Sequence, residues 1–256
     1  MIFDLEEFKN KKVIVTGSST GIGFHTALEF LNLGADVIFH GNNSTDGLEK
    51  KIELKTNKKN FKIIKSNFVD LENVNNFMDK SINHLGGLDI LINNAGTMIG
   101  RYNLDKISES EFLEIFDLNA KSAFFTTKKS INIFKEQKKG CIVNVSTISA
   151  RTGGSAGSSV YAASKAFVSG ITRSLVSELS PYNVRINAIS PGTIDTKFHE
   201  QYSSKEKLEA TRMKIPMQRL GKAEDCVGPI IFLSSNNLSG YMTGQILEIN
   251  GGQFIS

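Results

Sequence analysis

The chain has 256 residues, 40% of them hydrophobic and 22% charged, which is the composition of an ordinary globular domain. A formal net charge of +4 does not favour nucleic-acid binding, and no apolar run is long enough to span a membrane. The two cysteines, Cys141 and Cys226, lie far apart in apolar stretches, which argues against a disulfide framework or a metal site. Because the first ten residues also lack a long apolar run, we expect no signal peptide and a cytoplasmic location.

Short β-branched runs alternate with helical patterns along the whole chain. Stretches such as 22–33 and 71–85 place apolar residues three and four apart and are long enough for crossover helices. This alternation predicts an α/β fold, a doubly wound, seven-stranded parallel sheet (Rossmann fold) forming a single domain over residues 1–256. The predicted strands are residues 13–15, 37–39, 61–64, 88–92, 142–145, 184–189 and 246–249.

Two stretches between these elements carry weaker patterns. Lysines between residues 50 and 59 are interleaved with acids and polar residues, and we interpret them as the solvated face of a helix. Residues 197–222 form the longest weakly patterned stretch, which we expect to act as a lid over the substrate.

A glycine-rich loop, TGSSTGIG at residues 16–23, follows the first predicted strand directly and leads into a helix. Glycine lets the backbone turn tightly and approach a phosphate, while the helix N-terminus supplies free N–H groups and a partial positive charge. In a doubly wound sheet, dinucleotides bind at this first strand-to-helix turn. The loop therefore predicts a site for the pyrophosphate of a dinucleotide.

Further motifs follow in a fixed order, and together they resemble the short-chain dehydrogenase/reductase family. They are Asn93-Asn94-Ala95-Gly96, Asn119, Tyr161-x-x-x-Lys165, Pro191-Gly192 and the C-terminal segments 219–225, 243–244 and 251–252. The resemblance covers the whole chain and is nearest to the subgroup of 3-oxoacyl-acyl-carrier-protein reductases and glucose dehydrogenase-like enzymes. It implies an NAD(P)-dependent oxidoreductase that moves hydride between a nicotinamide and a carbonyl/alcohol pair.

Tyr161 and Lys165 are four residues apart, so on a helix they share one face. A tyrosine hydroxyl has a reference pKa of about 10, and a neighbouring ammonium favours the phenolate, so the spacing predicts that Lys165 lowers the pKa of Tyr161. The resemblance implies that Tyr161 is the general acid/base, that Lys165 also binds the nicotinamide ribose, and that Asn119 holds a water molecule.

The hydroxyl that meets the substrate is less well defined by the sequence. Counting back from Tyr161 by the family's spacing reaches Ile148, which has no hydroxyl. Aligning the preceding strand instead puts Thr147 at the catalytic position, with an extra residue between 151 and 159. Thr147 is our choice, and Ser146 and Ser149 remain alternatives.

The resemblance also implies contacts to the dinucleotide. The residues involved are Gly17, Ser19, Ile22 and Gly23 at the pyrophosphate and adjoining ribose, Asn94, Ala95 and Gly96 at the adenosine ribose, Asn67 and Phe68 at the adenine, and Pro191, Gly192, Ile194 and Thr196 at the carboxamide, with no metal site implied.

Cofactor preference depends on the segment that follows the second predicted strand, HGNNST at residues 40–45. An acid there would bind the ribose 2′-hydroxyl of NAD(H) and repel the 2′-phosphate of NADP(H), and none is present. The sequence thus favours NADP(H). The arginine that often accompanies this preference is missing at Asn42, so NAD(H) use and dual specificity remain open.

A second function class, a non-catalytic dinucleotide-binding sensor or scaffold, is compatible with the fold. The intact set of Asn119, Tyr161 and Lys165 favours an enzyme, whereas Thr147 is the one feature that favours a sensor. For an enzyme we expect a small-molecule carbonyl or alcohol as partner. We expect residues 97–103, 151–159 and 197–217 to line its pocket, without a readable substrate code.

We expect the chain to assemble with itself, because relatives usually form homotetramers through the helix that carries the Tyr-x-x-x-Lys motif, its neighbouring helix and the C-terminal segment. The apolar side chains expected at this interface are Phe124, Phe125, Ile131, Phe134 and residues 253–256.

Overall fold

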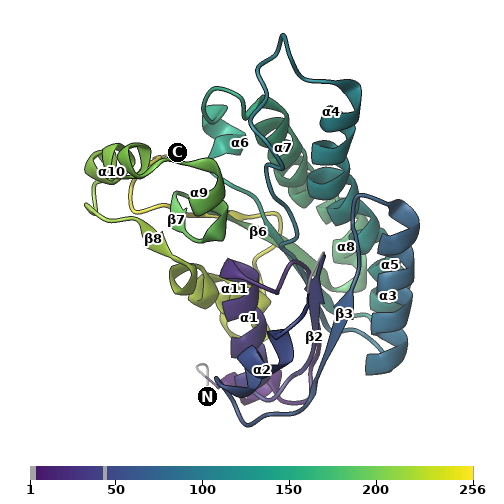
Figure 1. The fold of residues 1–256 in the computed structure, drawn as a ribbon. Helices are drawn as coiled ribbons and strands as arrows, with labels where there is room; N and C mark the ends of the chain where they lie inside the picture. Colours follow the sequence, from purple (N-terminus) through teal and green to yellow (C-terminus); the bar gives the residue numbers. More distant parts are fainter. Residues whose placement is uncertain (1–3, 43–44, 256) are drawn as a thin grey trace.

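Seven parallel strands form one sheet in the computed structural model, which describes residues 4–42 and 45–255 (Figure 1). Their order is β3-β2-β1-β4-β5-β6-β9, which confirms the predicted doubly wound fold and all seven predicted strands. The bounds are β1 (Lys12–Val15), β2 (Asp36–Gly41), β3 (Phe61–Lys65), β4 (Ile90–Asn93), β5 (Gly140–Val145), β6 (Val184–Pro191) and β9 (Ile246–Ile249).

The order of the strands reverses beside β1, and this reversal determines where a ligand can enter. β1 pairs on one side with β2 and on the other with β4, so that Val13 lies opposite both Val37 and Ile90. The connections on the two sides of β1 run in opposite directions and leave a crevice at the carboxyl ends of the strands.

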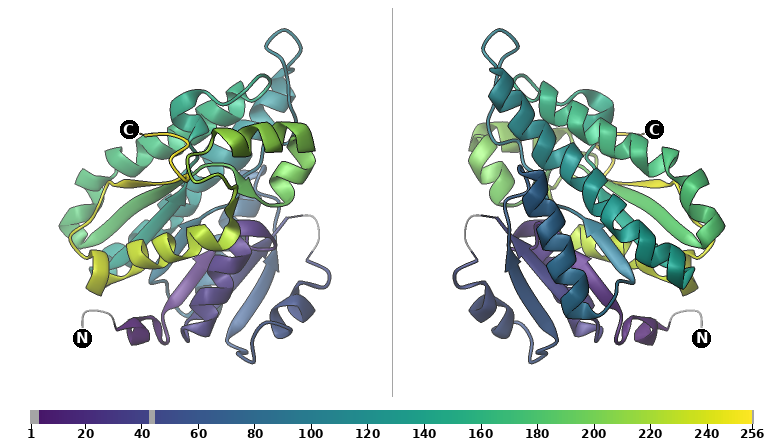
Figure 2. Two further views of the ribbon diagram at one scale, coloured as in Figure 1. Left: turned by 90° about the vertical axis from the view of Figure 1, so that its left-hand side faces the viewer. Right: turned by 90° about the vertical axis from the view of Figure 1, so that its right-hand side faces the viewer.

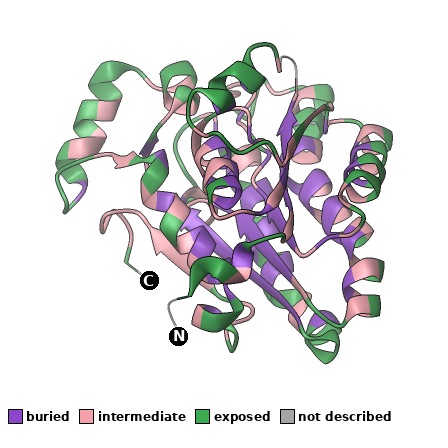
Figure 3. Ribbon diagram, turned by 90° about the horizontal axis from the view of Figure 1, so that it is seen from below, coloured by how far each residue is buried: buried purple, intermediate pink, exposed green. Residues whose placement is uncertain are grey.

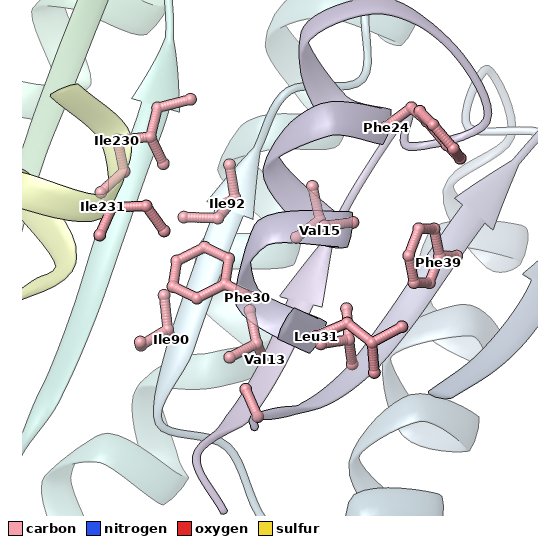
Figure 4. Close-up of a cluster of buried hydrophobic side chains, with 14 of the residues drawn as sticks. Val13, Val15, Phe24, Phe30, Leu31, Phe39, Ile90, Ile92, Ile230 and Ile231 are labelled. Atoms are coloured by element: carbon pink, nitrogen blue, oxygen red, sulfur yellow. The ribbon is translucent and has the colours of Figure 1, made fainter. Parts of the chain in front are cut away.

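Helices cover both faces of the sheet, which is why the central strands are continuous apolar runs. On one face α1 (Gly21–Asn32) packs on β1, and α11 (Val227–Ser234) packs on β5, β6 and α1, through a cluster that includes Phe30, Val15 and Ile230 (Figure 4). On the other face lie α3 (Leu71–Leu85), α5 (Ser122–Gln137) and α7 (Ser159–Ser174), shown in Figure 2. Figure 3 shows the buried residues concentrated in the sheet and on the helix sides that face it.

Shorter elements connect these layers. They are α2 (Leu48–Glu53), α4 (Glu109–Phe116), α6 (Ser149–Thr152), α8 (Val176–Leu179), α12 (Asn236–Ser239), the 3₁₀ turns η1 (Leu5–Phe8), η3 (Ser180–Tyr182) and η4 (Ala223–Cys226), and the π-helical turn η2 (Asp117–Lys121). The helix predicted across the lysine-rich segment 50–59 was wrong in extent. α2 ends at Glu53, and the three lysines at 55, 58 and 59 lie beyond it.

The weakly patterned stretch 197–222 is mostly ordered into short elements. It contains α9 (Lys197–Tyr202) and α10 (Lys205–Lys214), and it ends in β8 (Gly221–Lys222), which pairs with β7 (Ile194–Asp195). Figure 1 shows α9 and α10 beside the carboxyl ends of the strands, on the same side of the molecule as α6.

Two expectations from composition can be compared with the structure. Cys141 and Cys226 are both buried, and each is a free cysteine. Among the helices of residues 4–42 and 45–255, none is long and apolar enough to cross a membrane.

Candidate active site

A cavity of about 360 Å³ opens at the carboxyl ends of β1, β4, β5 and β6, where the reversal in strand order predicts a ligand. Its walls bring together residues from the glycine-rich loop, the strand ends, α7, β7 and the α9–α10 segment. Of the site residues predicted from sequence, those that line it are Gly17, Ile22, Asn94, Gly96, Thr147, Tyr161, Lys165, Pro191, Gly192, Ile194 and Thr196.

Gly17 and Gly23 shape the glycine-rich loop, each for a steric reason. Gly17 has a φ of +63°, and a Cβ atom there would lie 2.7 Å from the Cα of Ala95. A Cβ atom at Gly23 would collide with Gly17 O and with the amide of Asn94. That amide donates hydrogen bonds of 2.9 Å to Thr16 O and to Gly17 O. The shape of the loop is therefore maintained by its packing against Asn94, Ala95 and Gly23. Gly17 also lines the cavity.

His40, which sequence reasoning did not single out as a site residue, secures the same loop. Its Nδ1 accepts from Gly17 N at 2.9 Å, and its Nε2 lies 3.0 Å from Ser66 O. Burial lowers the pKa of His40 to about 4, so the ring is neutral near pH 7 and donates its Nε2 proton to the Ser66 carbonyl. The ring stacks on Phe68 with centroids 3.9 Å apart.

Three predicted adenosine-side residues lie near this histidine but do not line the cavity. The Phe68 side chain is buried in the core, so only its backbone is left for an adenine. Asn67 Oδ1 accepts from Val69 N at 3.1 Å. Asn42 Oδ1 is buried and has no hydrogen-bond partner among the described residues, and the neighbouring Asn43 and Ser44 lie outside them.

Lys51 lies beside the glycine-rich loop, although the sequence indicated only a solvated charge there. Its ammonium donates to Ser19 O at 3.3 Å and lies 3.6 Å from the centre of the Phe24 ring. Burial, followed by the nearby charges of Lys197 and Lys55, holds the pKa of Lys51 below its usual range. A cation from α2 therefore lies next to Ser19, a predicted cofactor contact.

Tyr161 and Lys165 lie on α7, with Thr147 just beyond the end of β5. Lys165 Nζ donates to Val145 O at 2.9 Å, and burial lowers the pKa of this lysine to about 8. Burial also raises the pKa of Tyr161 above its usual range, and the hydrogen bond with the Thr147 side chain opposes that rise. The expected lowering by Lys165 is therefore wrong for this structure, because the loss of hydration dominates. Tyr161 is a neutral phenol near pH 7.

The two rival serines make different contacts. Ser146 Oγ is 3.1 Å from Lys165 O and 2.7 Å from Ser169 Oγ, so this hydroxyl joins β5 to α7. Ser149 begins α6 and lines the cavity, and its N–H donates to Thr147 Oγ1 at 3.3 Å. Of the three hydroxyl side chains, that of Thr147 is the one whose interaction with the Tyr161 hydroxyl opposes the rise in the pKa of Tyr161.

Asn119 lies in the π-helical turn η2, a local widening of the helix that is frequent at functional sites. Its amide donates hydrogen bonds of 2.8 Å to Thr97 O and to Ile115 O, which fixes the direction of the side chain. Its Oδ1 is buried and has no partner among the described residues. A Cβ atom at Gly96 would collide with this Oδ1 and lie 2.9 Å from Lys165 Nζ. Both polar atoms therefore flank Gly96.

The three segments expected to line the substrate end do so. Their cavity-lining residues are Met98 and Arg101, then Thr152, Gly154, Ser155 and Ser158, then Phe198, His199, Ser203, Lys207, Leu208 and Thr211. The Phe198 ring lies 5.6 Å from the Tyr161 ring between centroids, so α9 reaches the predicted catalytic residue directly. The sequence indicated these segments and not the individual side chains.

Comparison with known proteins identifies the family of this chain. The family described as enoyl-(acyl carrier protein) reductase matches residues 17–253, nearly the whole chain. The chain belongs to the short-chain dehydrogenase/reductase family. Within this family it is 34% identical to a 3-oxoacyl-[acyl-carrier-protein] reductase of Thermotoga maritima over 249 residues, covering 96% of this chain and 99% of the relative. It is equally identical to an L-rhamnose 1-dehydrogenase (NAD(P)(+)) of Azotobacter vinelandii over 253 residues, covering 96% and 98%.

Solved structures of this family share the fold. The NADH-dependent reductase A1-R′, responsible for alginate metabolism, superposes with a TM-score of 0.88 at 31% identity, covering 98% of this chain and all of that one. A protein from Sinorhizobium meliloti that is described as a short-chain alcohol dehydrogenase superposes with a TM-score of 0.89 at 30% identity, with 98% of each chain covered. The short-chain dehydrogenase/reductase described here is an NAD(P)-dependent oxidoreductase, and a purely non-catalytic role is not favoured.

Proposed function

We propose that this enzyme reduces a small-molecule carbonyl to the alcohol, with Tyr161 as the proton donor. The observation that carries the proposal is that Thr147, Tyr161 and Lys165 line the same cavity as the glycine-rich loop. Because Tyr161 is a neutral phenol near pH 7, it holds the proton that a reduction consumes.

The residues divide the chemistry between them. A bound reduced nicotinamide supplies the hydride. Tyr161 donates its phenolic proton to the carbonyl oxygen, and Thr147 donates its single hydroxyl proton to the same oxygen in a hydrogen bond. Lys165, four residues from Tyr161, stabilises the phenolate left behind. Asn119 Oδ1, which has no partner among the described residues, holds a water molecule that returns the proton through Lys165.

The residues at the loop fit a dinucleotide. Gly17 and the start of α1 offer backbone N–H groups and the positive end of a helix to a pyrophosphate. Thr196 packs against Gly21 at the nicotinamide end, where a Cβ atom on the glycine would lie 3.5 Å from the threonine methyl group. The α9–α10 segment then serves as a lid over the bound cofactor and substrate.

NADP(H) is the preferred cofactor in this proposal. No acid occupies the end of β2, and Asn42 Oδ1 lacks a partner there among the described residues. Lys51 supplies the cation that the sequence lacks at Asn42, because its ammonium already lies against Ser19. Relatives do not decide the matter, since one is named for NAD(P)(+) and another for NADH.

The cofactor preference predicts a selective effect of Lys51→Met. We expect the Kd for NADPH to rise about tenfold, because a charge-assisted hydrogen bond to the 2′-phosphate is lost, while the Kd for NADH stays constant. Isothermal titration calorimetry measures both, with the exposed Lys55→Met as the matched control. Asn42→Arg should strengthen the preference. Tighter binding of NADH than NADPH by the unmodified enzyme would show that this interpretation of the loop is wrong.

We also propose that the enzyme is cytoplasmic and that it forms a homotetramer. An aromatic patch on α4, α5 and α7 supports the assembly. Phe116 and Phe167 lie 5.7 Å apart between centroids, with Phe112 and Phe124 beside them. Phe112 and Phe167 are 44% and 37% exposed. The expectation that Phe134 supplies interface surface was wrong, because this side chain is fully buried in the core. Ser256 of the expected C-terminal surface lies outside the described residues.

Assembly through this patch predicts that Phe167→Glu lowers the number of subunits in the oligomer, because burying an unpaired carboxylate there is unfavourable. Light scattering at micromolar concentration should give a tetramer for the unmodified enzyme and a smaller species for the variant. Leu54→Glu, at a residue 77% exposed just after α2, should leave the tetramer intact. A monomeric unmodified enzyme would contradict the assembly.

A panel of carbonyls and alcohols tests the function itself. We expect at least one class of aldehyde or ketone to be reduced, followed by the absorbance of the reduced nicotinamide, with NADPH consumed faster than NADH. The proposal fails if no carbonyl is reduced and no alcohol is oxidised with either cofactor.

A further inference from the structure

We infer that the substrate end of the cavity is an anion site, and that the enzyme takes a carbonyl compound carrying a carboxylate or phosphate group held by Arg101, Lys207 and Ser155. This inference rests on the proposed carbonyl reduction and specifies its substrate class.

Two cations converge there on one neutral hydroxyl. Arg101 Nη1 donates to Ser155 Oγ at 3.0 Å, and Lys207 Nζ donates to the same oxygen at 3.1 Å. Arg101 is held from two further sides, by Tyr202 O at 2.9 Å and Ala156 O at 3.0 Å. These bonds orient the guanidinium, although Arg101 and Lys207 are both exposed residues.

Neither cation forms an ion pair with an acid in the described part of the chain. Of the ion pairs found within residues 4–42 and 45–255, none includes Arg101 or Lys207. Burial and then the charge of Arg101 hold the pKa of Lys207 below its usual range, and His199 beside them also has a lowered pKa. Like charges that share one acceptor repel each other, and a bound anion would relieve that repulsion.

Unused donors also point to an anion. Ser155 Oγ accepts from both cations, so its own proton is not used in either bond. In the described part of the chain, the hydrogen bonds of Arg101 use Nε and Nη1 but not Nη2. An acceptor at this place would meet a hydroxyl, an ammonium and a guanidinium nitrogen, which is a donor set typical of carboxylate and phosphate sites.

The distance to Tyr161 suits one substrate molecule that reaches both places. The rings of Tyr161 and Phe198 are 5.6 Å apart, and those of Phe198 and Tyr202 are 5.1 Å apart. Arg101 is bonded to the carbonyl of Tyr202. Phe198 and Tyr202 are four residues apart on α9, which corresponds to a rise of about 6 Å along the helix. The carbonyl and the anionic group of the substrate should therefore be separated by several bonds, on the order of 10 Å or less.

Calorimetry on the full enzyme saturated with oxidised cofactor, which prevents turnover, tests the inference. The probes are 4-oxopentanoate, 5-oxohexanoate and 6-oxoheptanoate, their neutral methyl esters, and the oxoalkyl phosphates of matching length. We expect at least one acid or phosphate to bind roughly 10- to 100-fold more tightly than its neutral counterpart. The series with the larger gain identifies the anion.

Arg101→Gln and Lys207→Gln should each weaken the binding of the acid or phosphate about tenfold and leave the binding of the ester unchanged. Lys205→Gln, at an exposed lysine on the same helix, should have no effect and serves as the matched control. The inference is overturned if no acid or phosphate binds more tightly than its neutral counterpart, or if Lys205→Gln lowers the gain as much as Lys207→Gln. Anion-selective binding, with no carbonyl of the panel reduced and no alcohol oxidised with either cofactor, would contradict the proposed function and leave the anion site standing.

Discussion

Replacing Tyr161 by phenylalanine should lower kcat roughly 10²- to 10⁴-fold, the usual contribution of a general acid. The variant loses the phenolic proton and keeps the ring, so its packing against Phe198 should survive. Cofactor affinity should stay unchanged, because the hydroxyl acts on the substrate.

The measurements for this variant are steady-state kinetics on a confirmed substrate, with the Kd for NADPH and the thermal midpoint alongside. Tyr102→Phe is the matched control, since this tyrosine lies in the loop beside the cavity and does not line it. Unchanged turnover in Tyr161→Phe would contradict the proposed mechanism. A lower thermal midpoint would assign part of any loss in kcat to reduced stability of the fold.

The second large effect concerns the hydroxyl next to Tyr161. We expect Thr147→Ala to lose about 10²- to 10³-fold in kcat, because it removes a donor to the charge that develops on the carbonyl oxygen. Thr147→Ser keeps that donor and should retain activity. Ser149→Ala should do little, since the hydroxyl side chain that influences the pKa of Tyr161 is that of Thr147.

These three variants also separate Thr147 from its rivals. A severe loss in Ser149→Ala together with a mild one in Thr147→Ala would transfer the role to Ser149. Ser146→Ala is expected to act differently, through stability, because its hydroxyl joins Lys165 O to Ser169. It should lower the thermal midpoint more than it lowers kcat.

The strands were predictable because burial on both faces leaves a signal in the sequence itself. Ile14 and Ile142 belong to runs without polar interruption, which are typical of a parallel sheet covered by helices. The glycine-rich loop was predictable for a related reason, since close approach to a phosphate and to Asn94 requires glycine at fixed spacing.

Long-range neighbours were not predictable in the same way. Lys51 reaches Ser19 from a different helix, and Arg101 meets Lys207 only after α10 folds over the cavity. Phe134 shows a related limit. The pattern of α5 marks Phe124 and Phe134 equally as apolar, yet Phe134 is fully buried in the core and Phe124 lies in the aromatic patch.

The pKa of Tyr161 shows why charge spacing alone was insufficient. The neighbouring Lys165 predicted a lowered pKa, but the sequence carries no measure of how far the fold removes either group from water. Burial shifts both groups toward their neutral forms, so Tyr161 keeps its phenolic proton near pH 7.

Transfer of deuterium from a labelled nicotinamide tests the central claim most directly. The enzyme is incubated with NADPH that carries deuterium at the transferred position and with the carbonyl panel, including the oxo acids, and the alcohols are analysed by mass spectrometry. The account predicts an alcohol bearing deuterium on the former carbonyl carbon, formed by the unmodified enzyme and barely by Tyr161→Phe. Cofactor that binds by calorimetry without any labelled alcohol would contradict it and would point to the sensor or scaffold alternative.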